Sequence, residues 1–166
     1  DANVDVDNVT IDVTGALDAA GNAQENYMPL NEFGIDTLNP SVTNVTVDDT
    51  LLTDGDVGDK KLTVTVTFDE AMDTGTNPAL TFSPAVASTL TLDNGTWTNG
   101  TTFRAQYDVA DANVDVDNVT IDVTGALGVT GNAQQDYTPL NEFAIDTQAP
   151  TVVITDDESG VANIAG

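Results

Sequence analysis

The chain has 166 residues, of which 28 are Asp or Glu and only 3 are Lys or Arg, so its formal net charge is −25. Binding to nucleic acid requires a basic face, so this charge excludes nucleic acid as a partner and disfavours an anionic membrane surface. Cysteine and histidine are absent, which excludes Ser-His and Cys-His catalysis and most transition-metal sites. Apolar residues make up 40% of the chain, too many for a disordered acidic tail, and we expect a folded domain.

The N-terminal segment is repeated later in the chain. DANVDVDNVTIDVTGAL begins at Asp1 and recurs from Asp111, and the stretch that starts GNAQ at Gly21 recurs from Gly131. Self-similarity of this length predicts a tandem array with a repeat of about 110 residues. We expect residues 1–39 to be the C-terminal part of one repeat, 40–147 a complete repeat, and 148–166 the N-terminal part of the next.

The complete repeat alternates apolar and polar residues, which predicts strands and offers no helical stripe. The predicted strands are Ser41–Asp48, Lys61–Asp69, Ala79–Phe82, Ser88–Leu92, Thr96–Thr98, Thr102–Val109, Val116–Val123 and Asn141–Asp146, with hairpin turns at Asp93-Asn94-Gly95 and Asn99-Gly100. Short strands at this spacing favour an antiparallel β-sandwich. The predicted core residues are Phe68, Phe82, Trp97, Phe103, Tyr107, Val119 and Ile121.

The predicted repeat boundaries are two short segments that end in proline. They are Asp36-Thr37-Leu38-Asn39-Pro40 and Asp146-Thr147-Gln148-Ala149-Pro150. Proline fixes φ and biases the residue before it towards extended geometry, unlike a Gly/Ser tether. We therefore expect successive domains to be held end to end with little slack.

The acidic residues cluster in loops and suggest a hard cation. The candidate ligands are Asp1, Asn3, Asp5 and Asp7; their counterparts Asp111, Asn113, Asp115 and Asp117 after Asp108; Asp48, Asp54, Asp56 and Asp59; Asp69, Glu70 and Asp73; and the junction residues Asp36 and Asp146. Oxygen ligands at alternate positions of a turning loop suit Ca²⁺, which takes six to eight oxygens. The alternative interpretation is that these carboxylates are solvated loop residues that keep the protein soluble.

A sandwich entered at one end and left at the other places these clusters at two ends. Loops 48–60 and 108–117 should lie at the exit end, with Asp146 on the junction. Loops 69–73 and 131–132 should lie at the entry end and face the preceding domain. Calcium held between one exit end and the next entry end would then clamp neighbouring domains together.

Several motifs resemble those of a known group of proteins. FDEAMDT, the VTIDVTGALDAAGNAQ stretch and the Asp-Thr-x-x-Pro junction resemble the bacterial immunoglobulin-like extender repeats of giant RTX-type cell-surface adhesins. The resemblance implies secreted, extracellular domains that bind calcium at junctions and hold a distal binding domain away from the cell. It carries over to Asp36, Asp146, Asp69, Glu70 and the acidic exit loops. DAAGN at 18–22 becomes GVTGN at 128–132, so Asp18 is either a ligand missing from the second copy or a turn residue.

Two other functions are less well supported by the sequence. A ligand-binding adhesive module, for sugar or ice, would use the threonines of a strand face: Thr63, Thr65, Thr67, Thr89 and Thr91. Threonine is, however, an ordinary solvent-facing strand residue. An enzyme with paired carboxylates is disfavoured because the chain lacks histidine and any large loop to build a cleft.

The partial repeats at the two ends also predict partners. Each lacks most of its strands, so we expect neighbouring repeats, or head-to-tail completion between molecules, to cover the exposed apolar faces. The sequence contains no 18-residue apolar run and predicts no membrane insertion of this segment.

Overall fold

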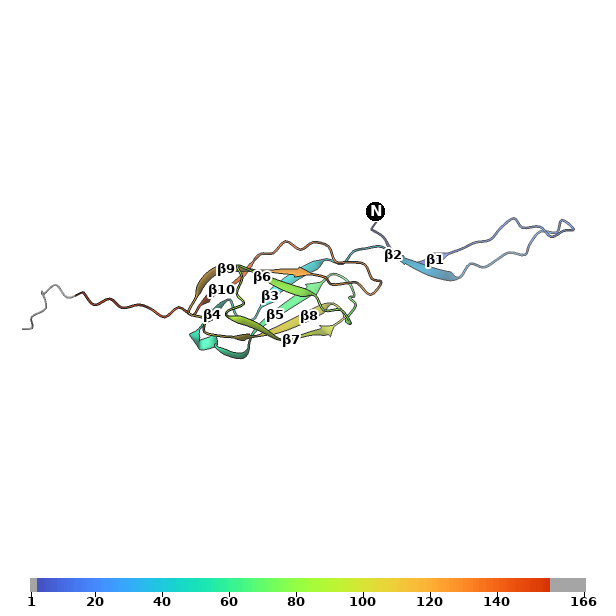
Figure 1. The fold of residues 1–166 in the computed structure, drawn as a ribbon. Helices are drawn as coiled ribbons and strands as arrows, with labels where there is room; N and C mark the ends of the chain where they lie inside the picture. Colours follow the sequence, from blue (N-terminus) through green and yellow to red (C-terminus); the bar gives the residue numbers. More distant parts are fainter. Residues whose placement is uncertain (1–2, 156–166) are drawn as a thin grey trace, which may run out of the picture.

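The computed structural model describes residues 3–155, and nearly all of its regular structure is β (Figure 1). The elements are β1 (Asp5–Thr10), β2 (Asn31–Asp36), β3 (Val42–Val47), β4 (Leu51–Thr53), the 3₁₀ turn η1 (Asp54–Asp56), β5 (Gly58–Phe68), β6 (Ala79–Ser83), β7 (Leu90–Asn99), β8 (Thr102–Val109), β9 (Asp115–Thr124) and β10 (Asn141–Asp146).

Residues 40–147 form two four-stranded sheets that share one core. The first sheet has the order β3-β5-β8-β7, and the second has the order β4-β10-β9-β6. All neighbouring strands are antiparallel, as predicted, with the exception of β4 and β10, which run parallel. Each sheet packs one face against the other sheet, and residues of both sheets form the core between them.

Strand β5 shows how the alternating pattern builds the core. Leu62, Val64, Val66 and Phe68 are all buried on its inner face. They pack with residues of the second sheet such as Ile121. Five of the seven predicted core residues are buried, whereas Phe82 and Trp97 are half-buried at the core margin. There, Phe82 packs edge-on against Tyr107 (5.2 Å between centroids), and Trp97 contacts Phe103 (5.4 Å).

The predicted turn at Asp93-Asn94-Gly95 is wrong. Strand β7 passes straight through these residues, with a bulge between Leu92 and Asn94. Gly95 lies over the ring of Phe103, and a Cβ there would lie 2.8 Å from Phe103 Cζ. This glycine allows a ring to approach the backbone closely, which is the other common reason for glycine within a strand. The predicted turn at Asn99-Gly100 is correct, because β7 ends there and β8 begins at Thr102.

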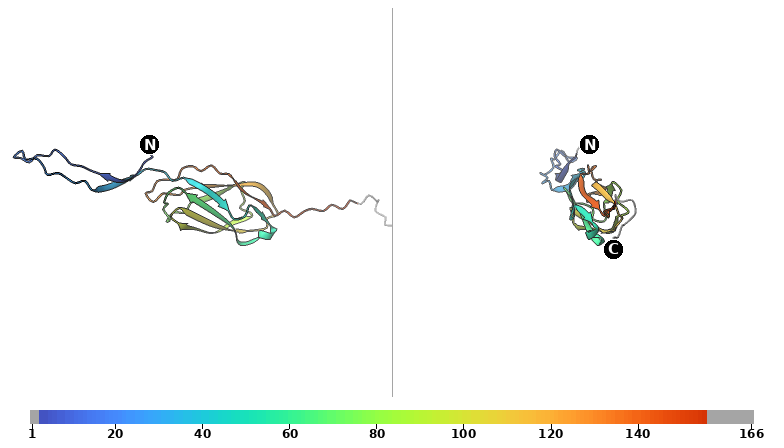
Figure 2. Two further views of the ribbon diagram at one scale, coloured as in Figure 1. Left: turned by 180° about the vertical axis from the view of Figure 1, so that it is seen from behind. Right: turned by 90° about the vertical axis from the view of Figure 1, so that its left-hand side faces the viewer.

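The N-terminal partial repeat forms an isolated hairpin. Strands β1 and β2 pair with each other alone and extend from one end of the two-sheet body, whereas residues 147–155 leave from the opposite end (Figure 1). The view from behind in Figure 2 shows the hairpin and the body following one another along one axis. The chain therefore enters and leaves the body at opposite ends, as the sequence predicted.

The hairpin and its repeat in the body differ in what covers them. Four apolar residues of the hairpin are exposed, whereas the residues at the matching positions of the body are buried. The exposed fractions are 51% at Ile11 and 0% at Ile121, 51% at Val13 and 0% at Val123, 48% at Phe33 and 4% at Phe143, and 39% at Ile35 and 0% at Ile145. Strand β1 also ends at Thr10, whereas β9 continues to Thr124 because β6 pairs with residues 120–124. The same sequence thus forms a longer strand and a buried face where a partner sheet exists.

Candidate interdomain acidic site

The linker between hairpin and body is held tightly by the body. Ser41 donates from its backbone N–H (2.7 Å) and from its hydroxyl to the carboxylate of Asp69. The carbonyl of Asn39 accepts from Gln135 Nε2 (2.9 Å), and the carbonyl of Pro40 accepts from the Gln135 backbone N–H (2.8 Å). Because three successive linker residues are bonded to the body, this junction has little slack.

A cavity of about 450 Å³ lies between the hairpin and the body at this junction. Its acidic lining residues are Asp5 and Asp7 of β1, Asp36 of β2 and Glu70 of the loop after β5; Val6, Gly34, Ile35, Ala71, Val129 and Thr130 complete the wall. The structure therefore brings together four of the predicted ligands. They come from elements that are separated by up to 65 positions in the sequence.

Two features make this cavity electrostatically unfavourable without a cation. Asp5 and Asp36 are direct cross-strand partners, and like charges in that position are destabilising. Glu70 has a buried Oε1 with no hydrogen-bond partner. Desolvation raises the pKa of Glu70 above its ordinary value, and the negative charges of Asp36, Asp69 and Asp5 raise it further.

The loop at residues 128–132 (here called the receiving loop) contacts the hairpin directly. Thr130 Oγ1 donates to Asp36 Oδ2 (2.8 Å). Asn132 Nδ2 donates to Asp36 O (3.2 Å) and Oδ1 (3.3 Å). The sequence predicts that this loop lies at the entry end and faces the preceding segment, and these bonds confirm that placement. The role of Thr130 was missed, although the change from DAAGN to GVTGN marked the position.

The opposite end of the body repeats the acidic pair. Asp115 and Asp146 are cross-strand partners at the ends of β9 and β10, as Asp5 and Asp36 are in the hairpin. Asp36 Oδ1 accepts from the backbone N–H of Leu38 (3.1 Å), and Asp146 Oδ1 accepts from that of Gln148 (3.2 Å). The same pair of carboxylates therefore lies at the C-terminal end of the unit that precedes each boundary.

Most of the remaining predicted ligands have a structural partner. Asp48 accepts from Thr63 N, Asp56 from Thr53, Asp73 from Gly75 and Thr76, Asp108 from Lys60 N, Asp111 from Asn113 N, and Asn113 from Ala149 N. Asn3, Asp54, Asp59 and Asp117 are not brought into the junction cavity. Asp1 lies outside the described residues. These bonds favour structural roles for the exit-end carboxylates: Asp56 and Asp111 stabilise local turns, whereas Asp48 and Asp108 accept from backbone N–H groups of β5.

No preformed metal cluster is present in residues 3–155: no three acidic side chains there are grouped so that they could hold an ion as placed. The junction cavity remains the place where the most predicted ligands meet. Its donor set is all oxygen, which suits Ca²⁺ in type. The orphaned Oε1 of Glu70 and the opposed carboxylates of Asp5 and Asp36 are the features that a cation would relieve.

The predicted threonine face is only partly exposed. Thr63 and Thr89 are buried, Thr65 and Thr67 are half-buried, and Thr91 is exposed. Arg104 Nη2 lies 3.4 Å from the Thr63 hydroxyl. The five threonines therefore do not form a continuous exposed array. Trp97 donates from Nε1 to the carbonyl of Thr76 (3.2 Å) and packs on the core, as expected for a structural residue.

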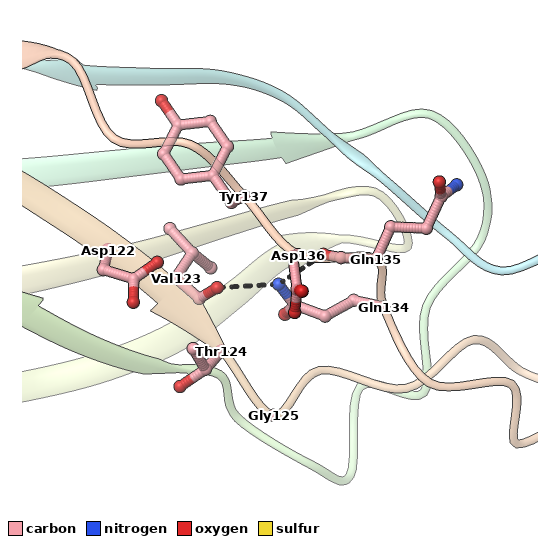
Figure 3. A pocket seen from close by; sticks show the side chains of 8 residues that line it. All are labelled: Asp122, Val123, Thr124, Gly125, Gln134, Gln135, Asp136 and Tyr137. Atoms are coloured by element: carbon pink, nitrogen blue, oxygen red, sulfur yellow. Dashed lines mark hydrogen bonds between the residues drawn. The ribbon is translucent and has the colours of Figure 1, made fainter.

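A second cavity, of about 350 Å³, lies between the end of β9 and the loop that returns from residue 134 (Figure 3). Gln134 crosses it, donating to the carbonyl of Val123 (2.7 Å) and accepting from Ala126 N (3.0 Å). Gln24 makes the same two bonds in the hairpin, to Val13 and Ala16. The glutamine is therefore a brace that belongs to the repeat, and it ties the long loop to the strand.

No protein-family model, curated protein or solved structure matches this chain. In the part of the chain that the structure describes, no helix has the length and apolar character needed to cross a bilayer.

Proposed function

We propose that this chain is a structural extender: immunoglobulin-like β-sandwich repeats of a secreted bacterial surface adhesin, joined end to end and stiffened by calcium at their junctions. The array would hold a distal binding domain away from the cell. In this role the repeat performs no catalysis, and its partners are neighbouring repeats.

The observation that carries the proposal is the junction cavity. Asp5 and Asp36 face each other across the hairpin, and Glu70 approaches them from the body with an unpartnered oxygen. Three carboxylates from two successive units repel one another, so positive charge between them would stabilise the joint. Calcium would supply that charge, with Asp5, Asp36 and Glu70 as its protein ligands.

Two further observations support an extender. The chain enters and leaves the body at opposite ends, so repeats joined in this way propagate along one axis (Figure 1). The linker is bonded to the body at Asn39, Pro40 and Ser41, which limits bending. Stability in such arrays is a sum of repeat and nearest-neighbour terms, so a stiffer joint stabilises both of its neighbours.

Thermal unfolding in millimolar calcium and in excess EGTA tests the proposal. A ligand that binds only the folded form stabilises it by about 2.7 kcal/mol at a hundred-fold excess over Kd. We expect the unfolding temperature to rise with calcium concentration, and we expect Asp36→Asn to reduce that rise. Asp12→Asn is the matched control, because Asp12 is an exposed hairpin aspartate away from the cavity. An unfolding temperature that does not change with calcium would overturn the calcium clamp.

A further inference from the structure

The two copies of the repeat have the same backbone turn at their tip loops but different side chains. Residues 18–22 read DAAGN, and the receiving loop at 128–132 reads GVTGN. The turn closes identically, from Asp18 N to Asn22 O (2.9 Å) and from Gly128 N to Asn132 O (2.8 Å). The difference between the loops is therefore in which polar groups they present.

In the first copy the aspartate satisfies the loop internally. Asp18 Oδ1 accepts from the backbone N–H groups of Ala20 (2.9 Å) and Asn22 (2.8 Å), and Oδ2 accepts from Asn22 Nδ2 (2.8 Å). The hydrogen bonds from Asn22 hold the pKa of Asp18 below its ordinary value. Asp18 is thus a turn residue, and it occupies the side-chain amide of Asn22.

In the second copy the corresponding amide is directed across the joint. Gly128 has no carboxylate, and Asn132 donates instead to the carbonyl and carboxylate of Asp36 and to Thr130 Oγ1 (3.0 Å). Thr130, which replaces Ala20, adds a hydroxyl donor to Asp36 (2.8 Å). The loops differ at three positions, and two of these, 128 and 130, determine which donors reach the hairpin.

We propose that the receiving loop is a metal-independent latch for the junction aspartate of the preceding repeat, and that the loop sequence sets how stiff each joint is. A G-x-T-G-N loop supplies two donors to that aspartate, whereas a D-A-A-G-N loop supplies neither. Joints of two kinds would therefore exist in one array. This inference rests on the proposed function, because it takes the hairpin to be the end of a preceding repeat.

The local geometry allows one loop to be converted into the other. A Cβ at Gly128 would lie 3.7 Å from Asn132 O and from Pro40 Cγ, which is ordinary van der Waals contact. Replacing this glycine by aspartate therefore changes the hydrogen-bond donors and acceptors of the loop without a steric clash. Converting the receiving loop to DAAGN is expected to turn the Asn132 amide towards the new carboxylate and away from Asp36.

The test measures the distribution of hairpin positions in the full chain without calcium. Because the chain contains no cysteine, Thr10→Cys and Thr96→Cys, both at exposed positions, provide two unique sites for spin labels. Double electron–electron resonance then gives the distribution of distances between the two labels. In EGTA we expect G128D/V129A/T130A to broaden that distribution. The reverse change in the other loop, D18G/A19V/A20T, is the matched control, and we expect it to leave the distribution unchanged.

Two further variants separate the latch from a general loss of folding. Thr130→Ala should broaden the distribution and Thr130→Ser should not, because serine retains the hydroxyl donor. Circular dichroism and urea unfolding show whether the body remains folded in each variant. An unchanged distribution in both G128D/V129A/T130A and Thr130→Ala, or equal broadening in the control loop, would overturn the latch. The proposed function is tested separately, by the calcium response, so the two failures are distinguishable.

Discussion

At the scale of single residues, Glu70 shows most clearly the cost of placing a carboxylate in a partly desolvated cavity beside other carboxylates. Its pKa is raised because the cavity desolvates it and because Asp36, Asp69 and Asp5 lie nearby. A carboxyl group whose folded-state pKa is raised contributes stability that is fully present below its unfolded pKa and is lost as pH rises through the folded value. Ionised Glu70 therefore destabilises the folded chain at neutral pH unless a cation is present.

This sign gives a prediction for Glu70→Gln. In EGTA at pH 7 we expect the variant to unfold at a higher temperature than the parent, and the difference should disappear as pH falls below the ordinary Glu value of 4.5. In calcium we expect the order to reverse, because the variant has lost a ligand. Calorimetry of the parent and the variant at pH 7 and at a pH below 4.5, with and without calcium, measures these differences in unfolding temperature.

Glu142→Gln is the control for that experiment. Desolvation alone raises the pKa of Glu142, and this residue does not line the junction cavity. We expect the substitution to stabilise the chain at neutral pH and to leave the calcium response unchanged. The same calcium response in Glu70→Gln as in the parent would contradict the assignment of Glu70 as a ligand.

At the scale of elements, most strands followed from alternation, but three features did not. Strand β5 was predicted to within three residues because its apolar positions alternate without interruption. Strand β4 and the turn η1 were missed because they span only three residues each, too few for a period to show. Asp93-Asn94-Gly95 has turn composition, yet tertiary contact with Phe103 determines its conformation. Sequence periodicity cannot report such a contact.

The same limit applies to the candidate site. Asp5, Asp36 and Glu70 were all named from the sequence, because loop carboxylates and the repeat boundary mark them. The sequence could not predict which of the 18 candidate ligands lie together in one cavity, because that depends on how the hairpin packs against the body. Asp108, near the end of β8, and Asp56, in η1, belong to equally acidic segments, but they accept hydrogen bonds from backbone N–H groups within the body.

Gly95 provides a test at the element scale. In Gly95→Ala the new Cβ would lie 2.8 Å from Phe103 Cζ, so the buried ring must move. We expect a loss of about 1–3 kcal/mol in the free energy of unfolding, as for overpacked cores. Gly100→Ala is the control, because a Cβ there meets nothing within 4 Å. Urea denaturation measures both, and equal losses would contradict a specific role for the contact between Gly95 and Phe103.

At the scale of the whole molecule, the chain contains its own comparison between a covered and an uncovered sheet. The hairpin and strands β9 and β10 have nearly the same sequence, yet only the second pair packs against the first sheet. Self-repulsion at a net charge of −25 opposes association of the hairpin with a second molecule, and salt weakens that repulsion. In an array, the sheet of the preceding repeat would cover this face.

The duplicated sequence allows one substitution to be made in two environments. Ile121 is fully buried between the sheets, whereas Ile11, at the matching position of the hairpin, is 51% exposed. Ile121→Asp places a charge in the core, and we expect it to lower the free energy of unfolding of the body by at least about 3 kcal/mol. Ile11→Asp should change it by less than about 0.5 kcal/mol, as for other surface substitutions. A large loss for Ile11→Asp in dilute solution would mean that another molecule already covers the hairpin, and sedimentation velocity on the same samples would then show the complex.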